Sequence, residues 1–475
     1  MKTLIQNAKI ITMNQEQSYF EQGCIVIDDN LISYVGDSPP QDKNSYDDIV
    51  DASGKLVIPG LVNAHCHSYA NYVKGMAPTI PLELWMLYIM AQGELMTPED
   101  VYWNAMFGAM EMIKTGTTCC IDHLAQGYDA LDGAMQAYKD IGLRAAIAPM
   151  ITDKPYHETL PISGREIPQI LKKPGASTDS LLDMTMKLLK KWHGQDNGRL
   201  KVFFGPSGPQ RCTDELLKEC ARLARVHQTG FHSHVLESSA QAQTAQLLYG
   251  EPMVCHLDKL GCLGENTTMV HAVWLTDEEI ALAAERKAVV VHNPASNFLL
   301  GSGIAPVNSY RSSQVAVSLG TDGVNVSGNH SLFGSIQLAA MIHNHNNNQP
   351  DTWIQPQDAL QMATQNGAKA FLDEQIGVIK EGCKADIAVL SLKDNCNMTP
   401  LNNVLWQLVH SSPGQLVDSV FVDGHAVLRN GKLVNIDEEL VLAEAERRGG
   451  RIREEFYSQK ETDILNKVQV FKQLF

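Results

Sequence analysis

The 475-residue chain lacks several features that would place a protein quickly in a class. Its ten cysteines never form a C-x-x-C pair, which argues against a zinc knuckle or a redox pair and favours a reducing cytoplasm. It has no hydrophobic run long enough to span a membrane, and residues 1–15 alternate apolar and polar side chains instead of forming a signal-peptide core. We therefore expect a cytoplasmic protein.

Positive charge is scarce as well, because 38 Lys+Arg stand against 54 Asp+Glu and give a net charge of −16. Such a surface repels phosphate backbones and anionic lipids, so neither nucleic acid nor a membrane is an expected partner. Hydrophobic residues make up 44% of the chain. The length favours one large globular domain accompanied by a smaller one.

The middle of the chain repeats one pattern, a short β-rich apolar segment followed by a turn and a longer helical stretch. The eight segments are 56–67, 116–125, 143–151, 200–206, 229–237, 268–274, 288–294 and 315–323. Eight strands that alternate with helices predict an α/β fold, namely a parallel (β/α)8 TIM barrel.

The two flanks of this central region show a different sequence pattern. Residues 3–58 contain hairpin-like runs of alternating apolar and polar residues, and similar runs return after about residue 370. This predicts a small composite β-sandwich domain, built from both ends of the chain, into which the barrel is inserted. The predicted boundaries are 1–58 and 371–436 for the two parts of the β-domain, 59–370 for the barrel and 437–475 for a C-terminal helical tail.

The first barrel segment ends in two histidines, His65 and His67, within "LVIPGLVNAHCHSYAN". Side chains at positions i and i+2 of a strand point to the same face, so both imidazoles can reach one metal ion. Two imidazoles suit zinc but do not complete a tetrahedral site. Further ligands are needed.

The same spacing occurs twice more, at His232/His234 and at His343/His345. The second of these pairs follows no strand-like run and is flanked by asparagines. It is therefore predicted to be a solvated loop or a frayed helix end.

Polar residues also stand at the ends of later strand segments. Taken singly, each has a structural explanation, such as a core histidine or a turn residue before glycine. The C-terminal ends of barrel strands converge on one face, however, which predicts a common site. These residues are His234 and Glu237 on strand five, His271 on strand six, His292 on strand seven and Asp322 on strand eight.

Five motifs together resemble the amidohydrolase superfamily over nearly the whole chain: "PGLVNAHCH", "HVLES", "MVHAVWL", "HNPASNFLLGSGIAPV" and "LGTDG". Within it the chain is similar to the mononuclear-metal branch that holds adenosine-derivative and guanine-type deaminases and triazine hydrolases. The composite β-domain of the superfamily matches the two flanks, including "IGVIKEGCKADIAVL".

The resemblance implies one divalent metal ion bound by His65, His67, His234 and Asp322. Three imidazoles and a carboxylate suit zinc, our first choice, or iron(II), and they leave a position open for water. Two-metal members of the superfamily place a bridging lysine at the end of strand four. Lys201 lies at the opposite, N-terminal end of that segment. One metal ion per chain is therefore expected.

The resemblance also implies catalytic roles. Glu237, three residues after a ligand, is expected to act as a general base that moves a proton from the water to a ring nitrogen, although an ordinary solvated carboxylate is the alternative. His271 is expected to polarise the water or substrate, and Asp322 to relay a proton to the leaving group. His232, which shares a strand face with His234, has no fixed role in the family and is predicted to support a ligand.

Trp85, Ser207, Gln210 and Asn297 are the candidate substrate-binding residues. Adenosine-derivative deaminases usually carry a histidine where this chain has Ser207, which weakens the prediction of a nucleoside substrate. A core position on an amphipathic helix is an equally open interpretation of Trp85. The insertion at 152–198 is expected to cover the mouth of the site and help select the substrate.

The predicted function is that of a metal-dependent aminohydrolase that releases ammonia from an amino-substituted purine, pterin, pyrimidine or triazine. A hydrolytic dehalogenase or dealkylaminase, or a carbamate or urea hydrolase, is the alternative on the same scaffold. A non-catalytic scaffold is disfavoured because no ligand is missing. The expected partners are a small heterocyclic substrate and further copies of the chain in a dimer or tetramer.

Overall fold

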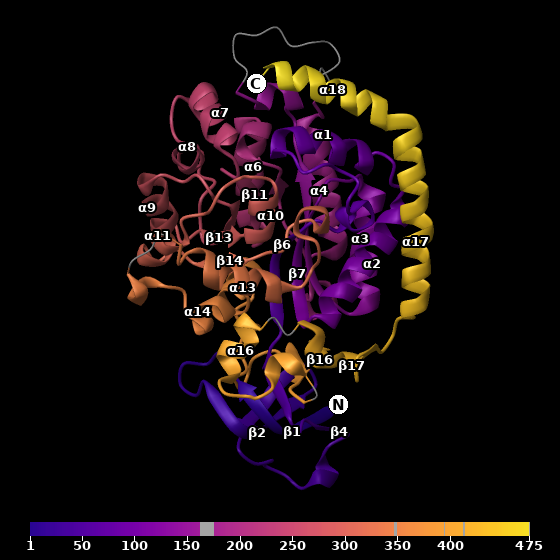
Figure 1. Cartoon of the computed structure of the whole chain (residues 1–475), viewed down its shortest axis with the longest axis vertical. Helices are drawn as coiled ribbons and strands as arrows, with labels where there is room; N and C mark the ends of the chain where they lie inside the picture. Colours follow the sequence, from indigo (N-terminus) through magenta and orange to yellow (C-terminus); the bar gives the residue numbers. More distant parts are fainter. Residues whose placement is uncertain (162–174, 346–348, 394, 412–413, 475) are drawn as a thin grey trace.

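The computed structural model describes residues 1–161, 175–345, 349–393, 395–411 and 414–474. An upper body of strands surrounded by helices stands above a smaller β-sheet that holds the N-terminus (Figure 1). Helices and strands are both abundant, so the predicted α/β class is confirmed. Among the helices of these ranges, none is both long and apolar enough to cross a membrane.

Within the described residues, the lower sheet has nine strands and contains strands from both parts of the predicted β-domain. β15 pairs antiparallel with β5, which itself pairs with β1, so sequence from beyond the barrel joins sequence from before it. The two-layer sandwich and the domain boundaries stay predictions. The strands are β1 (Lys2–Ile11), β2 (Tyr19–Asp28), β3 (Leu31–Gly36), β4 (Asp48–Asp51), β5 (Lys55–Pro59), β15 (Ile387–Ser391), β16 (Val417–Val422), β17 (His425–Arg429) and β18 (Lys432–Leu433).

The upper body contains a strand in each of the eight predicted segments, arranged in two parallel sheets. The segment 200–206 holds two short strands separated by Phe203 and Phe204. The first sheet comprises β6 (Leu61–Cys66), β7 (Thr117–Leu124), β8 (Arg144–Ile151), β9 (Leu200–Val202) and β10 (Gly205–Pro206). The second comprises β11 (Phe231–Val235), β12 (Thr267–His271), β13 (Val289–His292) and β14 (Val317–Leu319).

Single parallel bridges join the two sheets at both edges. Cys66 pairs with Asp322, and Phe204 pairs with Phe231. Backbone hydrogen bonds reinforce the first bridge, since the amides of Thr321 and Asp322 both donate to the carbonyl of His65. These contacts support a closed barrel, which stays a prediction.

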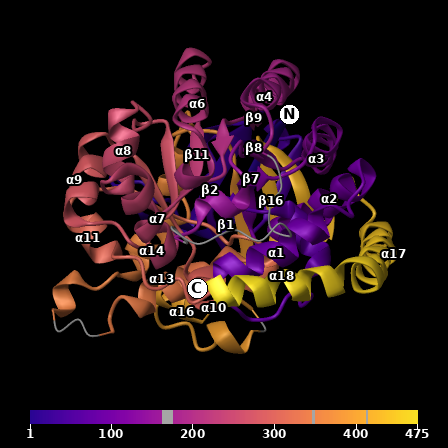
Figure 2. The same cartoon turned by 90° about the horizontal axis from the view of Figure 1, so that it is seen from above.

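Helices surround these strands, as Figure 2 shows from above. Their ends follow local sequence: Thr97 and Asp100 form a capping box before α2, and Gly142 ends α3 in the left-handed conformation with φ of 87°. The helices are α1 (Leu82–Gly93), α2 (Pro98–Lys114), α3 (Tyr128–Ile141), α4 (Thr178–Trp192), α5 (Gln195–Gly198), α6 (Asp214–Val226), α7 (Ser239–Tyr249), α8 (Met253–Lys259), α9 (Asp277–Glu285), α10 (Pro294–Leu299), α11 (Val307–Ser312), α12 (Val324–Ser327), α13 (Leu332–Ile342), α14 (Pro356–Met362), α15 (Gln365–Ala370) and α16 (Val404–His410).

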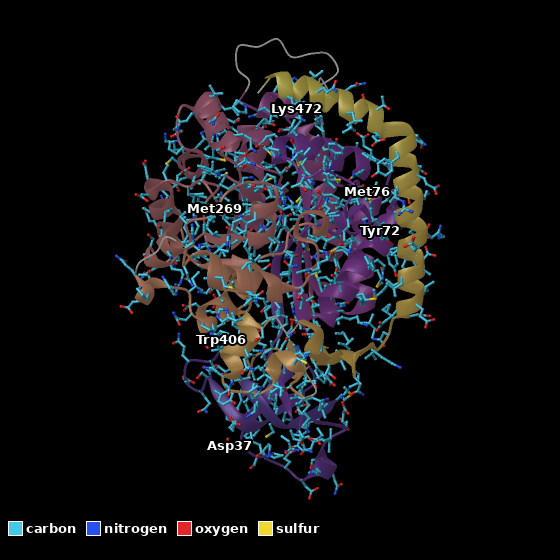
Figure 3. The ribbon with its side chains drawn as sticks, viewed as in Figure 1. Asp37, Tyr72, Met76, Met269, Trp406 and Lys472 are labelled. Atoms are coloured by element: carbon cyan, nitrogen blue, oxygen red, sulfur yellow. The ribbon has the colours of Figure 1, made fainter. Side chains whose placement is uncertain are left out.

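The C-terminal region is helical. α17 (Glu438–Glu455) continues through a π-helical turn at Phe456–Lys460 into α18 (Glu461–Leu474). The yellow ribbon in Figure 1 climbs one side of the upper body and then crosses its top. In Figure 3, Tyr72 and Met76 lie beside α17, and Lys472 marks α18. α17 and α18 therefore pack against the outer helices, and they approach the face where the strands end.

Candidate metal centre and active site

Four side chains meet where the strands end: His65 and His67 at β6, His234 from β11, and Asp322 after β14. The Nε2 atoms of His65 and His67 lie 3.6 and 3.3 Å from Oδ1 of Asp322. The Nε2 atoms of His67 and His234 are 3.4 Å apart. Ligands about 2.0–2.1 Å from a tetrahedral zinc ion are themselves about 3.4 Å apart, so these three distances fit ligands of a shared metal ion.

The hydrogen bonds of these histidines orient their Nε2 atoms toward one another. Nδ1 of His67 donates to the carbonyl of His123, and Nδ1 of His234 donates to the carbonyl of Ser207, both at 2.5 Å. Nε2 of each ring is then left with its lone pair. Nε2 of His65 is buried and has no hydrogen-bond partner among the described residues. A buried nitrogen without a partner among imidazoles held in this way is typical of a metal-binding site.

Electrostatics favour the protonation states that a metal ion requires. Burial, and then the neighbouring imidazoles, hold the pKa values of His65 and His234 well below the usual range. Burial acts to raise the pKa of Asp322, but the nearby histidines, led by His67, outweigh it and the pKa is lowered. Neutral imidazoles and an ionised carboxylate are the forms that bind a divalent cation.

Glu237 and His271 lie beside this cluster. Nε2 of His271 is 3.5 Å from Oε2 of Glu237 and 3.9 Å from Oδ2 of Asp322. Burial, followed by the charges of Asp322 and Glu83, raises the pKa of Glu237 well above its ordinary value. A carboxyl group with a raised pKa can both accept and release a proton near neutral pH, as a general acid/base must.

Left-handed backbone conformations occur at several of these strand ends. Leu236, His271 and Asp322 adopt φ angles of 50°, 70° and 61°, in the left-handed region that residues other than glycine rarely occupy. Such conformations cost about 1–3 kcal/mol each and are common at functional sites. At His271 and Asp322 the strained residue is itself one whose side chain joins the cluster.

One cavity connects the cluster to the candidate substrate-binding residues. Trp85, Ser207 and Gln210 line it together with Glu237. Asn297 is not part of its wall. Nδ1 of His271 donates to the side-chain oxygen of Asn297 at 2.8 Å, so the structure places Asn297 behind His271.

The cavity wall also contains residues that the sequence analysis missed. Glu83, at the start of α1, accepts a hydrogen bond from Ser238 at 2.5 Å. Tyr156 comes from the insertion at 152–198, of which 162–174 lie outside the described residues, and its hydroxyl donates to the carbonyl of Glu83. Arg211 stacks over the Tyr156 ring at 5.3 Å. A carboxylate two residues before Trp85 was a signal for Glu83, whereas nothing local marked Tyr156.

Two other histidine predictions have different outcomes. His292 does not line the cavity, because its Nε2 lies 3.4 Å from Nε2 of His343. The predicted helix end is present, since His343 directly follows α13. The prediction of a solvated position was wrong for His343, which is buried where this helix end meets β13. It holds for His345, which is exposed.

Comparison with known proteins places the chain in a family. The Amidohydrolase family matches residues 56–427. The 5'-deoxyadenosine deaminase of Methanosarcina mazei is 34% identical over 445 residues, which cover 94% of this chain and 96% of the relative. The 5-methylthioadenosine/S-adenosylhomocysteine deaminase of Thermoanaerobacter pseudethanolicus is 33% identical over 450 residues, with 94% and 98% covered.

Solved structures agree with this placement. An adenosine deaminase from Xanthomonas campestris with bound zinc has a TM-score of 0.85 and 26% identity, with 95% of this chain and 98% of the other covered. A zinc complex of atrazine chlorohydrolase from Arthrobacter aurescens has a TM-score of 0.86, with 94% and 100% covered, and its 24% identity shows the fold alone. The chain therefore belongs to the amidohydrolase family and lies in its branch of hydrolytic deaminases.

Proposed function

We propose that this enzyme replaces the amino group of a nitrogen heterocycle by oxygen and releases ammonia, with an adenosine-type purine as the first candidate substrate. The observation that carries the proposal is that His67, His234 and Asp322 line one cavity together with Glu237 and His271, with Nε2 of the buried His65 3.6 Å from Oδ1 of Asp322. The relatives are named as deaminases of adenosine derivatives, which supports ammonia as the leaving group and a purine as the ring. Ser207 at the position of the usual histidine keeps pterins, pyrimidines and triazines as further candidates.

The proposed cofactor is one divalent ion per chain, zinc first and iron(II) as the alternative, held by His65, His67, His234 and Asp322. The spacing of the donor atoms and the unpartnered Nε2 of His65 fit such an ion. Lys201 cannot bridge a second ion, since its Nζ donates to the carbonyls of Phe371 and Leu372 at the far end of the strand. When bound, the ion supplies a water whose pKa is lowered to about 7 as the nucleophile.

The side chains around the site would perform the proton transfers. Because Nδ1 of His271 donates to Asn297, its Nε2 is an acceptor that can orient the attacking water. Glu237 takes a proton from this water and gives it to the ring nitrogen next to the carbon under attack. Asp322 relays the second proton to the amino group, which leaves as ammonia while the carbon keeps the oxygen. Water and amine are thereby converted to a ring carbonyl and ammonia, with all atoms balanced.

Metal analysis tests the proposed cofactor. We expect close to one zinc or iron ion per chain, loss of the ion and of ammonia release after treatment with a chelator, and recovery of both when zinc is returned. Elemental analysis of the purified protein, before and after dialysis against the chelator, measures the stoichiometry. Two tightly held ions per chain would contradict the single site.

A substrate panel tests the reaction. It contains 5'-deoxyadenosine, 5'-methylthioadenosine and guanine, followed by aminopterins, aminopyrimidines and aminotriazines, and ammonia release is the measurement. We expect at least one aminopurine to be deaminated. If chlorotriazines or alkylaminotriazines react instead, and only chloride or alkylamine appears, the enzyme is a dehalogenase or dealkylaminase. If no compound reacts with the metal-loaded enzyme, the proposal fails.

We also propose a homo-oligomer, a dimer or tetramer. Large apolar side chains stay exposed in the single chain near the strand-end loops, among them Trp274, Phe298 and Ile304, which are 46%, 46% and 47% exposed. Exposed apolar patches commonly mark interfaces between proteins, and these three residues are the candidates for such a patch. Light scattering at micromolar concentration measures the mass, and a value of one chain would contradict the proposal.

A further inference from the structure

His65 obtains its orientation in a way that differs from the other two histidines of the cluster. The Nδ1 atoms of His67 and His234 donate to backbone carbonyls. Nδ1 of His65 instead lies 3.0 Å from Nε2 of another histidine, His232, and Nδ1 of His232 lies 2.5 Å from Oγ1 of Thr268. Only the orientation of His65 therefore depends on side chains that a substitution can change.

Two contacts indicate the direction of the hydrogens along the row His65–His232–Thr268. At one end Oγ1 of Thr268 donates to the carbonyl of Phe231 at 3.4 Å, and a carbonyl can only accept. Oγ1 then accepts from Nδ1 of His232, which leaves the lone pair of His232 on Nε2 to accept from Nδ1 of His65. At the other end a metal ligand must keep its Nε2 free of hydrogen. Both requirements give the same direction.

Burial makes this row the only source of partners for its atoms within the described structure. His65 and His232 are fully buried, and Thr268 is 3% exposed. Without access to water, the loss of one acceptor leaves a buried donor unsatisfied, which favours a change of tautomer over an unpaired N–H.

We propose that His232 and Thr268 form a hydrogen-bond relay that sets the tautomer of His65 and thereby the affinity of the site for its metal ion. Both are positioning residues, since neither is among the four proposed ligands. The inference rests on the proposed metal site. If the relay loses its acceptor, the hydrogen of His232 moves to Nε2, which then donates to His65 and forces the hydrogen of His65 onto the nitrogen that should bind the metal.

The test compares Thr268→Val with Thr268→Ser. Valine has the shape of threonine without the acceptor, whereas serine keeps the acceptor and loses a methyl group. We expect Thr268→Val to bind zinc 10–100-fold more weakly than the wild type, the usual effect of losing such a partner, and Thr268→Ser to keep wild-type affinity. Competition between the apo-protein and a chelator of known affinity measures zinc binding, and thermal unfolding of the apo-proteins measures stability.

Thr267→Val is the matched control. Thr267 is the preceding residue of β12, is equally buried, and donates its hydroxyl to the carbonyl of Cys262, away from the cluster. Its substitution should leave zinc affinity unchanged. If Thr268 only fills space, the order reverses, because serine would create a small void and valine would not.

Several outcomes overturn the relay. They are wild-type zinc affinity in Thr268→Val, an equal loss in Thr267→Val, or a loss in Thr268→Ser that matches that in Thr268→Val. ¹⁵N NMR of histidine-labelled wild-type apo-protein gives an independent measurement: hydrogen on Nδ1 of both His65 and His232 supports the relay, and hydrogen on Nε2 of either contradicts it. A wild-type protein that binds no zinc would instead refute the proposed function.

Discussion

Glu237→Gln is expected to keep the metal ion and to lose turnover by on the order of a hundredfold or more, as when a positioned general acid/base is removed. Glutamine has the same shape but cannot accept a proton from water at neutral pH. Attack on the ring carbon is then no longer coupled to protonation of the ring nitrogen. The kcat for ammonia release from the best panel substrate is the measurement.

The geometry predicts that metal binding and catalysis separate in this variant. Glu237 approaches His271, at 3.5 Å, and is not a member of the groups of side chains close enough to hold one ion. Metal content should therefore stay at the wild-type level in Glu237→Gln, whereas His234→Ala should lose the ion. Elemental analysis of both variants distinguishes the two effects.

Glu83→Gln provides the matched control, because it makes the same change at the other glutamate that lines the cavity among the described residues. Glu83 lies in the first turn of α1 and is not among the proposed ligands or proton carriers. Its charge helps to raise the pKa of Glu237, so Glu83→Gln should shift the pH dependence of turnover and lower kcat far less than Glu237→Gln does. If Glu237→Gln turned over its substrate at nearly the wild-type rate, the carboxylate would be a bystander. Asp322 or His271 would then have to carry the proton.

Arg144→Met is expected to lower the free energy of unfolding by about 3–5 kcal/mol, the usual result of leaving a buried charge without its partner. Arg144 begins β8 at the end opposite the active site and is fully buried. Its Nε and Nη2 donate to the two oxygens of Asp386 at 2.8 and 2.9 Å, and Nη2 also donates to Asp423 at 3.2 Å. Both aspartates belong to the lower sheet, next to β15 and β16, so one guanidinium joins the upper body to it.

Denaturant unfolding measures the loss, with two variants as controls. Arg144→Lys keeps the charge without the planar pair of donors and should lose less stability. Adding Asp386→Asn to Arg144→Met should recover part of the loss, because the buried carboxylate is then neutral. Metal content should stay unchanged. If Arg144→Met unfolds at the same denaturant concentration as the wild type, the ion pair contributes nothing to the stability of the contact between the upper body and the lower sheet.

Much of the architecture could be predicted because its signals are local. A short apolar run followed by a turn identifies a strand wherever it occurs, and each of the eight predicted segments contains one. The spacing of His65 and His67 identifies a shared strand face in the same way. The flanking hairpin patterns predicted that both chain ends contribute to one β-unit, and β5 and β15 do pair.

The predictions were wrong or missing for residues whose position is decided by contacts between segments that are distant along the chain. His343 sits in an asparagine-rich stretch whose composition indicates solvent, yet the end of α13 carries it against His292. Asn297 lies in a motif that is typical of the family, but the position of α10 places it behind His271. Tyr156 enters the cavity from an insertion with no distinguishing local pattern.

The sequence by itself determined the strands and the residue types available for proton transfer, since these depend on neighbours along the chain, and its resemblance to a family supplied the candidate ligands. Tertiary structure alone decided which histidines face one another through Nε2, which residues shape the cavity, and how His232 and Thr268 come to support His65. The physical reason is that hydrogen-bond direction and burial depend on atoms brought together from separate strands. No spacing along one strand contains that information.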